Sequence, residues 1–408
     1  MKPLKCLAIT NSYPPDHAGG YELGACNLLE SLAKNFAWEN TVYSSVRKEK
    51  SHRTMSTQLT GFFPGRLGPD FQRWRTKRAL IRNHQRIVSE LKTETNQADI
   101  IFIFNPRRLV LPEWTSVLEL GKPVFVFVSD FWPQDPWATD IFHSRSSKNE
   151  SNELKDSALR TLYSSVLKPS QFFSNFTGAM FGSEFMQRTH AETFSLIKNQ
   201  CVAHWGIDTD SFPEVPFSSE RLKVFGFCGR PEKEKGLDLA LDAFREISKH
   251  DDDLRFMIAS DLRRSSFGRS IIKKISSDPI LASRVSILGD VPYSDLHRVF
   301  YSKIGVLLFP SVWKEPFALT VLEAMASCVL VIASNTGGTP EIVDQSTGYS
   351  FDPLVNGSLV NACIDVLKIL DGNHDRIQRG ALRIRSNHSL PFMAKKVDDF
   401  IRRTLYNS

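Results

Sequence analysis

Two cations in the second half of the chain stand where they could bind phosphate. Arg230 and Lys235 follow an apolar run, ending at Gly229, that predicts a β-strand, and a helix is predicted to begin soon after them. Guanidinium and ammonium groups at the end of a strand can hold a diphosphate and stabilise the charge that it gains as a leaving group. The alternative is an ordinary charged loop, in which Glu232 and Glu234 pair with the same cations.

Two carboxylates, Glu315 and Glu323, lie further along the chain in the segment FPSVWKEPFALTVLEAM. Glu315 is predicted in the turn after a buried strand and Glu323 about two turns into the next helix, so both can face one pocket. Carboxylates bind paired sugar hydroxyls well, because both oxygens accept hydrogen bonds, and the N–H groups of the helix N-terminus near 317–319 can bind phosphate. As alternatives, Glu315 is an exposed loop acid and Glu323 an ordinary helix acid, although the neighbours of Glu323 are apolar.

Glycine pairs follow two other predicted strands. Gly337 and Gly338 lie in the segment SNTGGTP, and Gly19 and Gly20 lie between the first strand and the first helix. Glycine lets the backbone approach a ligand closely, but tight turns use it as well. Each pair alone is therefore a weak indication of a binding site.

These residues belong to an alternation of short apolar runs with amphipathic helical patterns in both halves of the chain. This alternation predicts parallel α/β sheets, in which ligands bind beyond the carboxyl ends of the strands. The predicted strands are 5–10, 100–104, 124–128 and 179–181 in the first half and 224–228, 255–259, 285–288, 304–309 and 329–333 in the second.

The length and composition fit an enzyme of two domains. A chain of 408 residues exceeds what one hydrophobic core usually supports, and 41% hydrophobic with 24% charged residues is typical of a globular protein. The start of the chain fits a first strand better than a signal peptide, and no apolar run reaches the ~18 residues of a transmembrane helix. Six single cysteines without a Cys-x-x-Cys pair indicate reduced residues and a cytoplasmic protein.

The net charge of +6 is concentrated in a basic segment, residues 66–92. Its cations are Arg66, Arg73, Arg75, Lys77, Arg78, Arg82, Arg86 and Lys92. Apolar residues recur among them at roughly helical spacing, which suits peripheral contact with an anionic membrane. An amphipathic helix with a solvated basic face is an equal alternative. No recognition motif accompanies the charge, so no nucleic-acid partner is expected.

Taken together, the segments resemble the family-4 retaining glycosyltransferases (glycosyl transferases group 1) of the GT-B fold, strongly over residues 225–351 and weakly from residue 1. The resemblance implies two Rossmann-like domains with parallel sheets facing an inter-domain cleft. It implies a metal-independent, retaining hexosyltransferase that moves a sugar from a nucleoside-diphosphate sugar to an acceptor hydroxyl, with no cofactor beyond that co-substrate. The acceptor is expected to be a cell-envelope or exopolysaccharide glycan, or a lipid-linked one, which places the protein in the cytoplasm or at the inner face of the membrane.

The resemblance also implies roles for single residues. In the E-x7-E pattern, Glu315 matches the glutamate that contacts the donor sugar and Glu323 the one that contacts the ribose. Arg230 and Lys235 match the cations on the diphosphate. The remaining donor-binding residues implied are Gly19, Gly20, Gly229, Val291, Phe317, Ala318 and Leu319.

The same resemblance divides the chain into an acceptor-side domain (1–209), a nucleotide-sugar-binding domain (210–390) and a C-terminal helix that crosses back to the first domain (391–408). Asp208 and Asp210 form a D-x-D pattern, but the segment around them matches the family's inter-domain linker and not a metal motif. No metal site is therefore expected.

The chain departs from the family pattern in three places. Ser129 and Asp130 stand where the family often has His-Asp, so Asp130 is expected to take part of the histidine's catalytic role. Cys328 and Ala318 occupy positions that are usually glycine. These departures keep two alternatives open: another enzyme of this fold, such as a sugar-nucleotide epimerase or a phosphorylase, and a non-catalytic module that binds nucleotide sugars.

Overall fold

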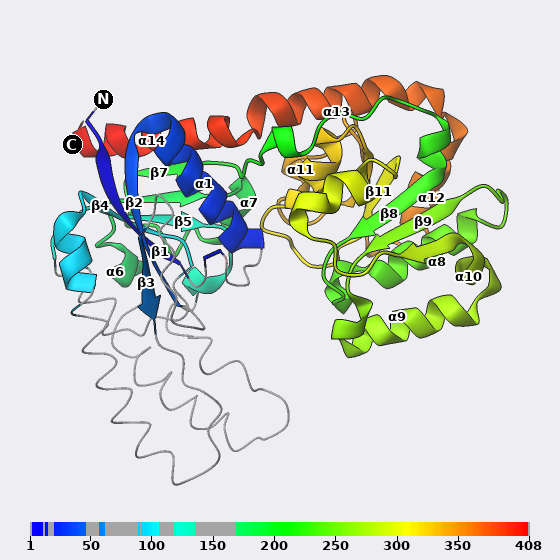
Figure 1. The fold of residues 1–408 in the computed structure, drawn as a ribbon, viewed down its shortest axis with the longest axis horizontal. Helices are drawn as coiled ribbons and strands as arrows, with labels where there is room; N and C mark the ends of the chain where they lie inside the picture. Colours follow the sequence, from blue (N-terminus) through cyan, green and yellow to red (C-terminus); the bar gives the residue numbers. More distant parts are fainter. Residues whose placement is uncertain are drawn as a thin grey trace, which may run out of the picture. The chain divides into compact units, whose positions relative to one another are not determined.

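The computed structural model of the chain describes residues 2–10, 13–14, 20–45, 57–61, 89, 91–105, 118, 120–134 and 169–406. The chain divides into two units (Figure 1). The first comprises Met1–His204 with Met393–Ser408, and the second comprises Trp205–Phe392. Among the described residues, no helix has the length and apolar character needed to cross a membrane.

A seven-stranded sheet forms the centre of the first unit, in the order β3-β2-β1-β4-β5-β6-β7, and its paired strands run parallel. Strands that are apolar on both faces favour this arrangement, because helices cover both faces of a parallel sheet. Every residue of β5, with the sequence VFVFV, is buried. The strands are β1 (Leu4–Thr10), β2 (Trp38–Ser45), β3 (Thr57–Gly61), β4 (Ile100–Ile103), β5 (Val124–Val128), β6 (Gly178–Phe181) and β7 (Gln200–Val202).

The last helix of the chain, α14 (Leu390–Tyr406), packs on the first unit from Met393 onward. The Phe400 ring meets the edge of Phe125 on β5, and the indole of Trp38 donates a hydrogen bond of 2.7 Å to the buried carboxylate of Asp398. A buried carboxylate needs such partners, because burying it unpaired costs several kcal/mol. Helices α1 (Gly20–Phe36), α6 (Pro169–Phe173) and α7 (Glu184–Thr189) also belong to this unit.

The second unit has a six-stranded sheet in the order β10-β9-β8-β11-β12-β13, again with parallel pairing. Its strands are β8 (Val224–Cys228), β9 (Arg255–Ala259), β10 (Val285–Ile287), β11 (Val306–Phe309), β12 (Leu330–Ser334) and β13 (Tyr349–Phe351). The helices are α8 (Leu237–Ile247), α9 (Ser266–Ser277), α10 (Pro279–Arg284), α11 (Leu319–Ala326), α12 (Ser358–Lys368) and α13 (His374–Asn387). The predicted fold class, two parallel α/β domains, is confirmed.

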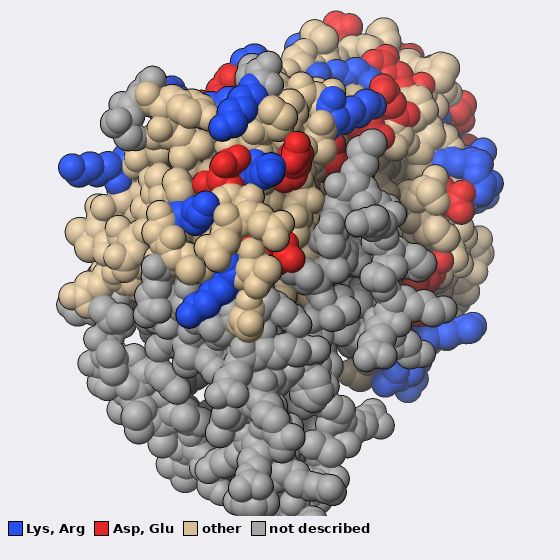
Figure 2. Space-filling view, turned by 60° about the vertical axis from the view of Figure 1, so that its left-hand side comes forward, with Lys and Arg blue, Asp and Glu red and all other residues tan. Residues whose placement is uncertain are grey.

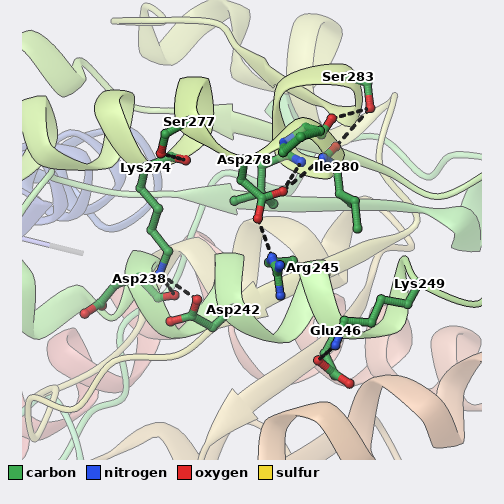
Figure 3. A network of polar contacts seen from close by, with 12 residues as sticks. Asp238, Asp242, Arg245, Glu246, Lys249, Lys274, Ser277, Asp278, Ile280 and Ser283 are labelled. Atoms are coloured by element: carbon green, nitrogen blue, oxygen red, sulfur yellow. Dashed lines mark hydrogen bonds and ion pairs between the residues drawn. The ribbon is translucent and has the colours of Figure 1, made fainter.

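Ion pairs tie three helices of the second unit together (Figure 3). Asp278 caps α10 by accepting hydrogen bonds from the backbone N–H groups of Ile280 (2.9 Å) and Leu281 (3.1 Å), and it also pairs with Arg245 of α8. Lys274 of α9 contacts Asp242 of α8 at 2.6 Å. Basic and acidic side chains are also interspersed on the described surface that Figure 2 turns to the viewer.

The second unit begins at Trp205, somewhat earlier than the boundary predicted at 209/210. The reason is a short backbone pairing within this unit. The N–H of Ile207 donates to the carbonyl of His388, and the N–H of Leu390 donates to the carbonyl of Ile207, both at 2.9 Å. A Cβ on Gly206 would lie 2.7 Å from the carbonyl oxygen of Ser389, so the close approach requires glycine there.

Candidate functional site

Three loops of the second unit meet at one edge of its sheet. They follow β8, β11 and β12, which are neighbours in the strand order, so their carboxyl ends lie side by side. Backbone hydrogen bonds join the loops: the N–H of Val312 donates to the carbonyl of Glu234 (2.9 Å), and the N–H of Gly338 donates to the carbonyl of Glu315 (2.8 Å). The predicted phosphate-binding and sugar-binding segments are therefore in contact.

Two glycines make this contact sterically feasible. Gly236 has φ +73°, and a Cβ on it would lie 2.0 Å from the carbonyl oxygen of Pro310. Gly337 has φ +61°, and a Cβ there would lie 2.3 Å from the carbonyl oxygen of Glu315. Both positions combine a left-handed backbone with a backbone neighbour that cannot move aside, so only glycine fits. Gly337 thus serves the packing of the Glu315 loop.

Glu315 and Lys235 form an ion pair at the centre of the three loops. The Lys235 ammonium donates to Oε1 of Glu315 at 2.6 Å, and the hydroxyl of Ser311 donates to the same oxygen at 2.8 Å. The side chains of Lys235 and Glu315 are only 18% and 10% exposed. A partly desolvated pair is stronger than a surface one and is costly to break by removing one partner. Lys235 keeps further N–H donors that can bind an anion while Glu315 holds it in place.

Arg230 is not part of this cluster. Its side chain is 72% exposed and pairs with Glu232 at 2.8 Å, which is the loop pairing that the sequence left open. An exposed ion pair of this kind contributes little free energy. The structure therefore joins Lys235, but not Arg230, to Glu315.

The helix α11 begins directly after the Glu315 loop. Its N-cap residue, Ala318, has no side-chain oxygen, and no side chain caps the first turn. Phe317 and Ala318 are buried, whereas Leu319, the first helical residue, is partly exposed. The first N–H groups of a helix have no intrahelical partner and carry the positive end of its dipole, which favours an anion.

Glu323 lies on the second turn of α11 and is only 4% exposed. The hydroxyl of Tyr301 donates to its Oε2 at 2.7 Å. Burial raises the pKa of Glu323 to about 7, while hydrogen bonds from Tyr301 and Tyr293 act in the opposite direction. Val291, the residue expected near the base, is half-buried in the same loop as Tyr293. Glu323 is thus a buried carboxylate that accepts a hydrogen bond from the phenol of Tyr301.

In the first unit, the predicted site residues follow β1 and β5. Asp130 is half-buried after β5: its carboxylate accepts from the N–H of Phe131 at 2.5 Å, and its carbonyl pairs with Nε2 of His190 at 3.0 Å. Burial lowers the pKa of His190 to about 4, so this histidine is neutral at physiological pH. Gly20 begins α1 and is exposed. Gly19 lies outside the described residues, as does nearly all of the basic segment 66–92.

The D-x-D pattern has a structural role. Asp208 caps a short 3₁₀ turn by accepting from the N–H of Asp210 (3.3 Å) and the hydroxyl of Ser211 (2.6 Å). Within the described part of the chain, no group of three or more His, Cys, Asp or Glu residues is arranged to hold a metal ion.

Three residues at the site are not predicted from the sequence: Ser311, Tyr293 and Tyr301. Ser311 stands four residues before Glu315 and directly after the strand-ending Pro310, which is a local signal that could have found it. The two tyrosines carried no such signal, because only the tertiary fold brings them to Glu323.

Known proteins resemble this chain in sequence and in fold. Residues 208–383 match the family model "Glycosyl transferases group 1". The chain is 25% identical over 305 residues to lipopolysaccharide 1,2-N-acetylglucosaminetransferase of Salmonella typhimurium, a match that covers 71% of this chain and 69% of that protein. Other curated relatives match over less than half of their own length.

Two solved structures share the fold over nearly the whole chain. Sucrose-phosphate synthase of Thermosynechococcus elongatus superposes with a TM-score of 0.71 at 17% identity, covering 99% of this chain and 100% of that one. HepE of Anabaena, in complex with UDP and glucose, gives a TM-score of 0.68 at 15% identity, with coverages of 98% and 99%. At these identities the likeness establishes the GT-B fold and no more.

Proposed function

We propose that the chain is a retaining, metal-independent hexosyltransferase of the glycosyl transferases group 1 family, whose model residues 208–383 match. It moves a sugar from a nucleoside-diphosphate sugar to an acceptor hydroxyl. The observation that carries the proposal is the nearly buried pair of Lys235 and Glu315, 2.6 Å apart, beside the uncapped start of α11. A cation, a carboxylate and free helix N–H groups together suit a sugar diphosphate.

The donor diphosphate binds between Lys235 and the first turn of α11. There the ammonium and the helix dipole stabilise the negative charge that grows as the bond from the sugar to the diphosphate breaks. Arg230, exposed and weakly paired with Glu232, turns from that acid to the diphosphate when the donor binds. These groups supply the positive charge that a metal ion supplies elsewhere.

Glu315 orients the donor sugar and Glu323 binds the ribose. The acceptor oxygen forms its bond to the anomeric carbon on the face that the diphosphate leaves, so the configuration is retained. A diphosphate oxygen takes the acceptor's proton. Asp130, on the first unit, keeps the catalytic role that the family resemblance implies for its position. Its loop is braced by His190, whose ring pairs with the Asp130 carbonyl.

The acceptor we propose is a glycan of the cell envelope or of an exopolysaccharide, free or linked to lipid. The support is the relative from Salmonella typhimurium, a lipopolysaccharide N-acetylglucosaminetransferase. UDP-sugars are the first donors to test, because the structurally similar HepE has been crystallised with UDP and glucose.

The test is acceptor-dependent release of nucleotide from a panel of UDP-, GDP- and ADP-sugars. The wild-type protein should turn over at least one donor, and Glu315→Ala should lower that rate by about 100-fold or more, since one lost charged partner of the transition state costs ~3 kcal/mol. The matched control is Glu246→Ala, which removes an exposed acid of α8 that pairs with Lys249. Turnover by Glu315→Ala at the wild-type rate would refute the proposed role of this residue.

A further inference from the structure

A phenol and a carboxylate are buried against each other beneath the predicted ribose site. Tyr301 is fully buried, Glu323 is 4% exposed, and the tyrosine hydroxyl lies 2.7 Å from Oε2 of the glutamate. The two residues are 22 positions apart in the sequence. Burying a carboxylate costs free energy unless its oxygens accept hydrogen bonds, so this contact determines the orientation of the Glu323 side chain.

The Tyr301 ring has little freedom to move. It ends a short π-helix (His297–Tyr301), an irregularity that is frequent at functional sites. The rings of Phe212 and Phe300 lie against it at 5.7 and 5.2 Å in edge-to-face geometry. A phenol fixed in this way delivers its O–H to Glu323 from one direction.

A second phenol reaches the same carboxylate. Tyr293, partly exposed in the loop that follows β10, lies close enough to Glu323 for its hydroxyl to lower the pKa of the carboxyl and for the carboxylate to raise the pKa of the phenol. Phe212 also packs against Tyr293, with ring centres 5.7 Å apart, so one aromatic side chain supports both tyrosines.

Other titratable groups near the cluster do not replace these donors. The thiol of Cys228, on β8, lies close enough to Glu323 for the negative charge to raise its pKa further, beyond the effect of burial. Asp208 acts on Tyr293 in the same direction. Neither a thiol with a raised pKa nor a carboxylate stabilises the negative charge of Glu323. The phenols are therefore the groups in this cluster that favour its ionised form.

We propose that Tyr301 and Tyr293 are positioning residues that hold the Glu323 carboxylate so that it accepts the hydroxyls of a nucleotide ribose, and thereby set the preference for ribonucleotide donors. The inference rests on the proposed function. Tyr301 occupies one lone-pair direction of Oε2 and leaves the remaining directions for a pair of neighbouring hydroxyls. Without the phenol, the Glu323 carboxylate turns toward another hydrogen-bond donor of the protein. The ribose hydroxyls then no longer find its oxygens at hydrogen-bonding distance.

The experiment compares two ligands with several variants by calorimetry on the full chain. The ligands are the tightest-binding of UDP, GDP and ADP and its 2′,3′-dideoxy counterpart. The wild type should prefer the ribose form by about 100-fold, because a site built for hydroxyls leaves its polar groups unpaired with the analogue. Tyr301→Phe should reduce that preference to about tenfold, by weakening the ribose form and leaving the dideoxy form nearly unchanged.

Tyr349→Phe is the matched control. It removes a hydroxyl that donates to Asn373 at 2.9 Å in the same unit, and the preference should stay at the wild-type value. In a Glu323→Gln background, Tyr301→Phe should have no further effect on the preference, because its action passes through that carboxylate. If Tyr301→Phe does not fold, the partly exposed Tyr293→Phe gives the same readout, with a smaller reduction expected.

Two failures are distinguishable. If the wild type binds none of the diphosphates, the proposed function is overturned. Suppose instead that the wild type binds a diphosphate, and that the tyrosine variants lower the affinity for the ribose and dideoxy ligands equally or lower neither. Then only the positioning role is overturned, because such tyrosines merely support the fold.

Discussion

At the scale of single residues, the site combines groups whose burial makes each depend on its partner. Lys235 and Glu315 are both mostly buried, and Ser311 donates to the same carboxylate oxygen. Removal of one member leaves an uncompensated charge, whereas replacement of both by neutral groups of similar volume removes the charges together. Comparing the single with the double replacement therefore distinguishes the pair's contribution to stability from its role in binding the donor.

We therefore predict that Lys235→Met alone lowers the free energy of unfolding by about 3 kcal/mol and that Lys235→Met combined with Glu315→Gln recovers most of the loss. Neither protein should turn over the donor, because both lack the cation. Denaturant unfolding and nucleotide release measure the two properties. The exposed pair of Lys368 and Asp365, 3.3 Å apart, is the control, and Lys368→Met should change neither. Recovered turnover in the double variant would contradict the account.

Glu323 gives a prediction about pH. Its pKa is raised from 4.5 to about 7 in the folded protein, chiefly by burial. Between these values the folded state binds more protons than the unfolded state, so this residue's contribution to stability falls as pH rises through that window. Glu323→Gln removes the titration and keeps an acceptor for Tyr301.

We therefore compare the free energy of unfolding of Glu323→Gln with that of the wild type at each pH. The variant's value minus the wild-type value should be about 2 kcal/mol higher at pH 8 than at pH 5. Denaturant unfolding of both proteins at the two pH values measures this difference. The nucleotide affinity of Glu323→Gln should be lower than that of the wild type at pH 8. An equal stability difference at the two pH values would mean that Glu323 is ionised throughout, in conflict with its burial.

At the scale of elements, the site depends on three loops that follow neighbouring strands. Their backbones approach one another so closely that a side chain at the contact would not fit. The backbone contact between Gly338 and Glu315 joins the β12 loop to the β11 loop, and Gly337 makes room for it. Gly337 belongs to a glycine pair that is only a weak indication in the sequence, and it has a definite steric role in the structure.

Gly337→Ala should accordingly displace the Glu315 loop. We expect a loss of stability of about 2 kcal/mol or more and at least tenfold weaker nucleotide binding, because a left-handed strain and a backbone clash act together. Gly357→Ala is the control: it has a similar φ of +78° but no atom within 4 Å of the new Cβ. It should lose about 1 kcal/mol and bind nucleotide normally. Equal effects of the two substitutions would show that strain alone matters at Gly337.

At the scale of the whole molecule, the sequence predicted the two α/β units because buried parallel strands read as continuous apolar runs. β8 and β9 were predicted at their observed bounds, and β11 and β12 within two residues at either end. β13 (Tyr349–Phe351) was missed because it is short and has a serine at its centre, and β2 (Trp38–Ser45) because its sequence, WENTVYSS, is largely polar.

The site was predictable only where its parts are local in sequence. The loops after β8, β11 and β12 could be read from strand ends, glycines and charges. The contact of Lys235 with Glu315 and the hydrogen bond from Tyr301 to Glu323 could not, since each joins segments that are separate in the sequence. The pairing of Arg230 with Glu232 lies within one loop and is one of the two alternatives that the sequence leaves open. The tertiary contacts decide which of several charged partners a side chain takes.

The anomeric configuration of the product tests the proposed retaining mechanism directly. The full chain is incubated with the donor it turns over and its acceptor, in the presence of EDTA, and the anomeric proton of the new glycoside is followed by NMR. A retaining, metal-independent enzyme gives a product with the configuration of the donor, formed at a rate that EDTA does not change. A product of inverted configuration, or a reaction that stops when metal is removed, would contradict the proposed mechanism.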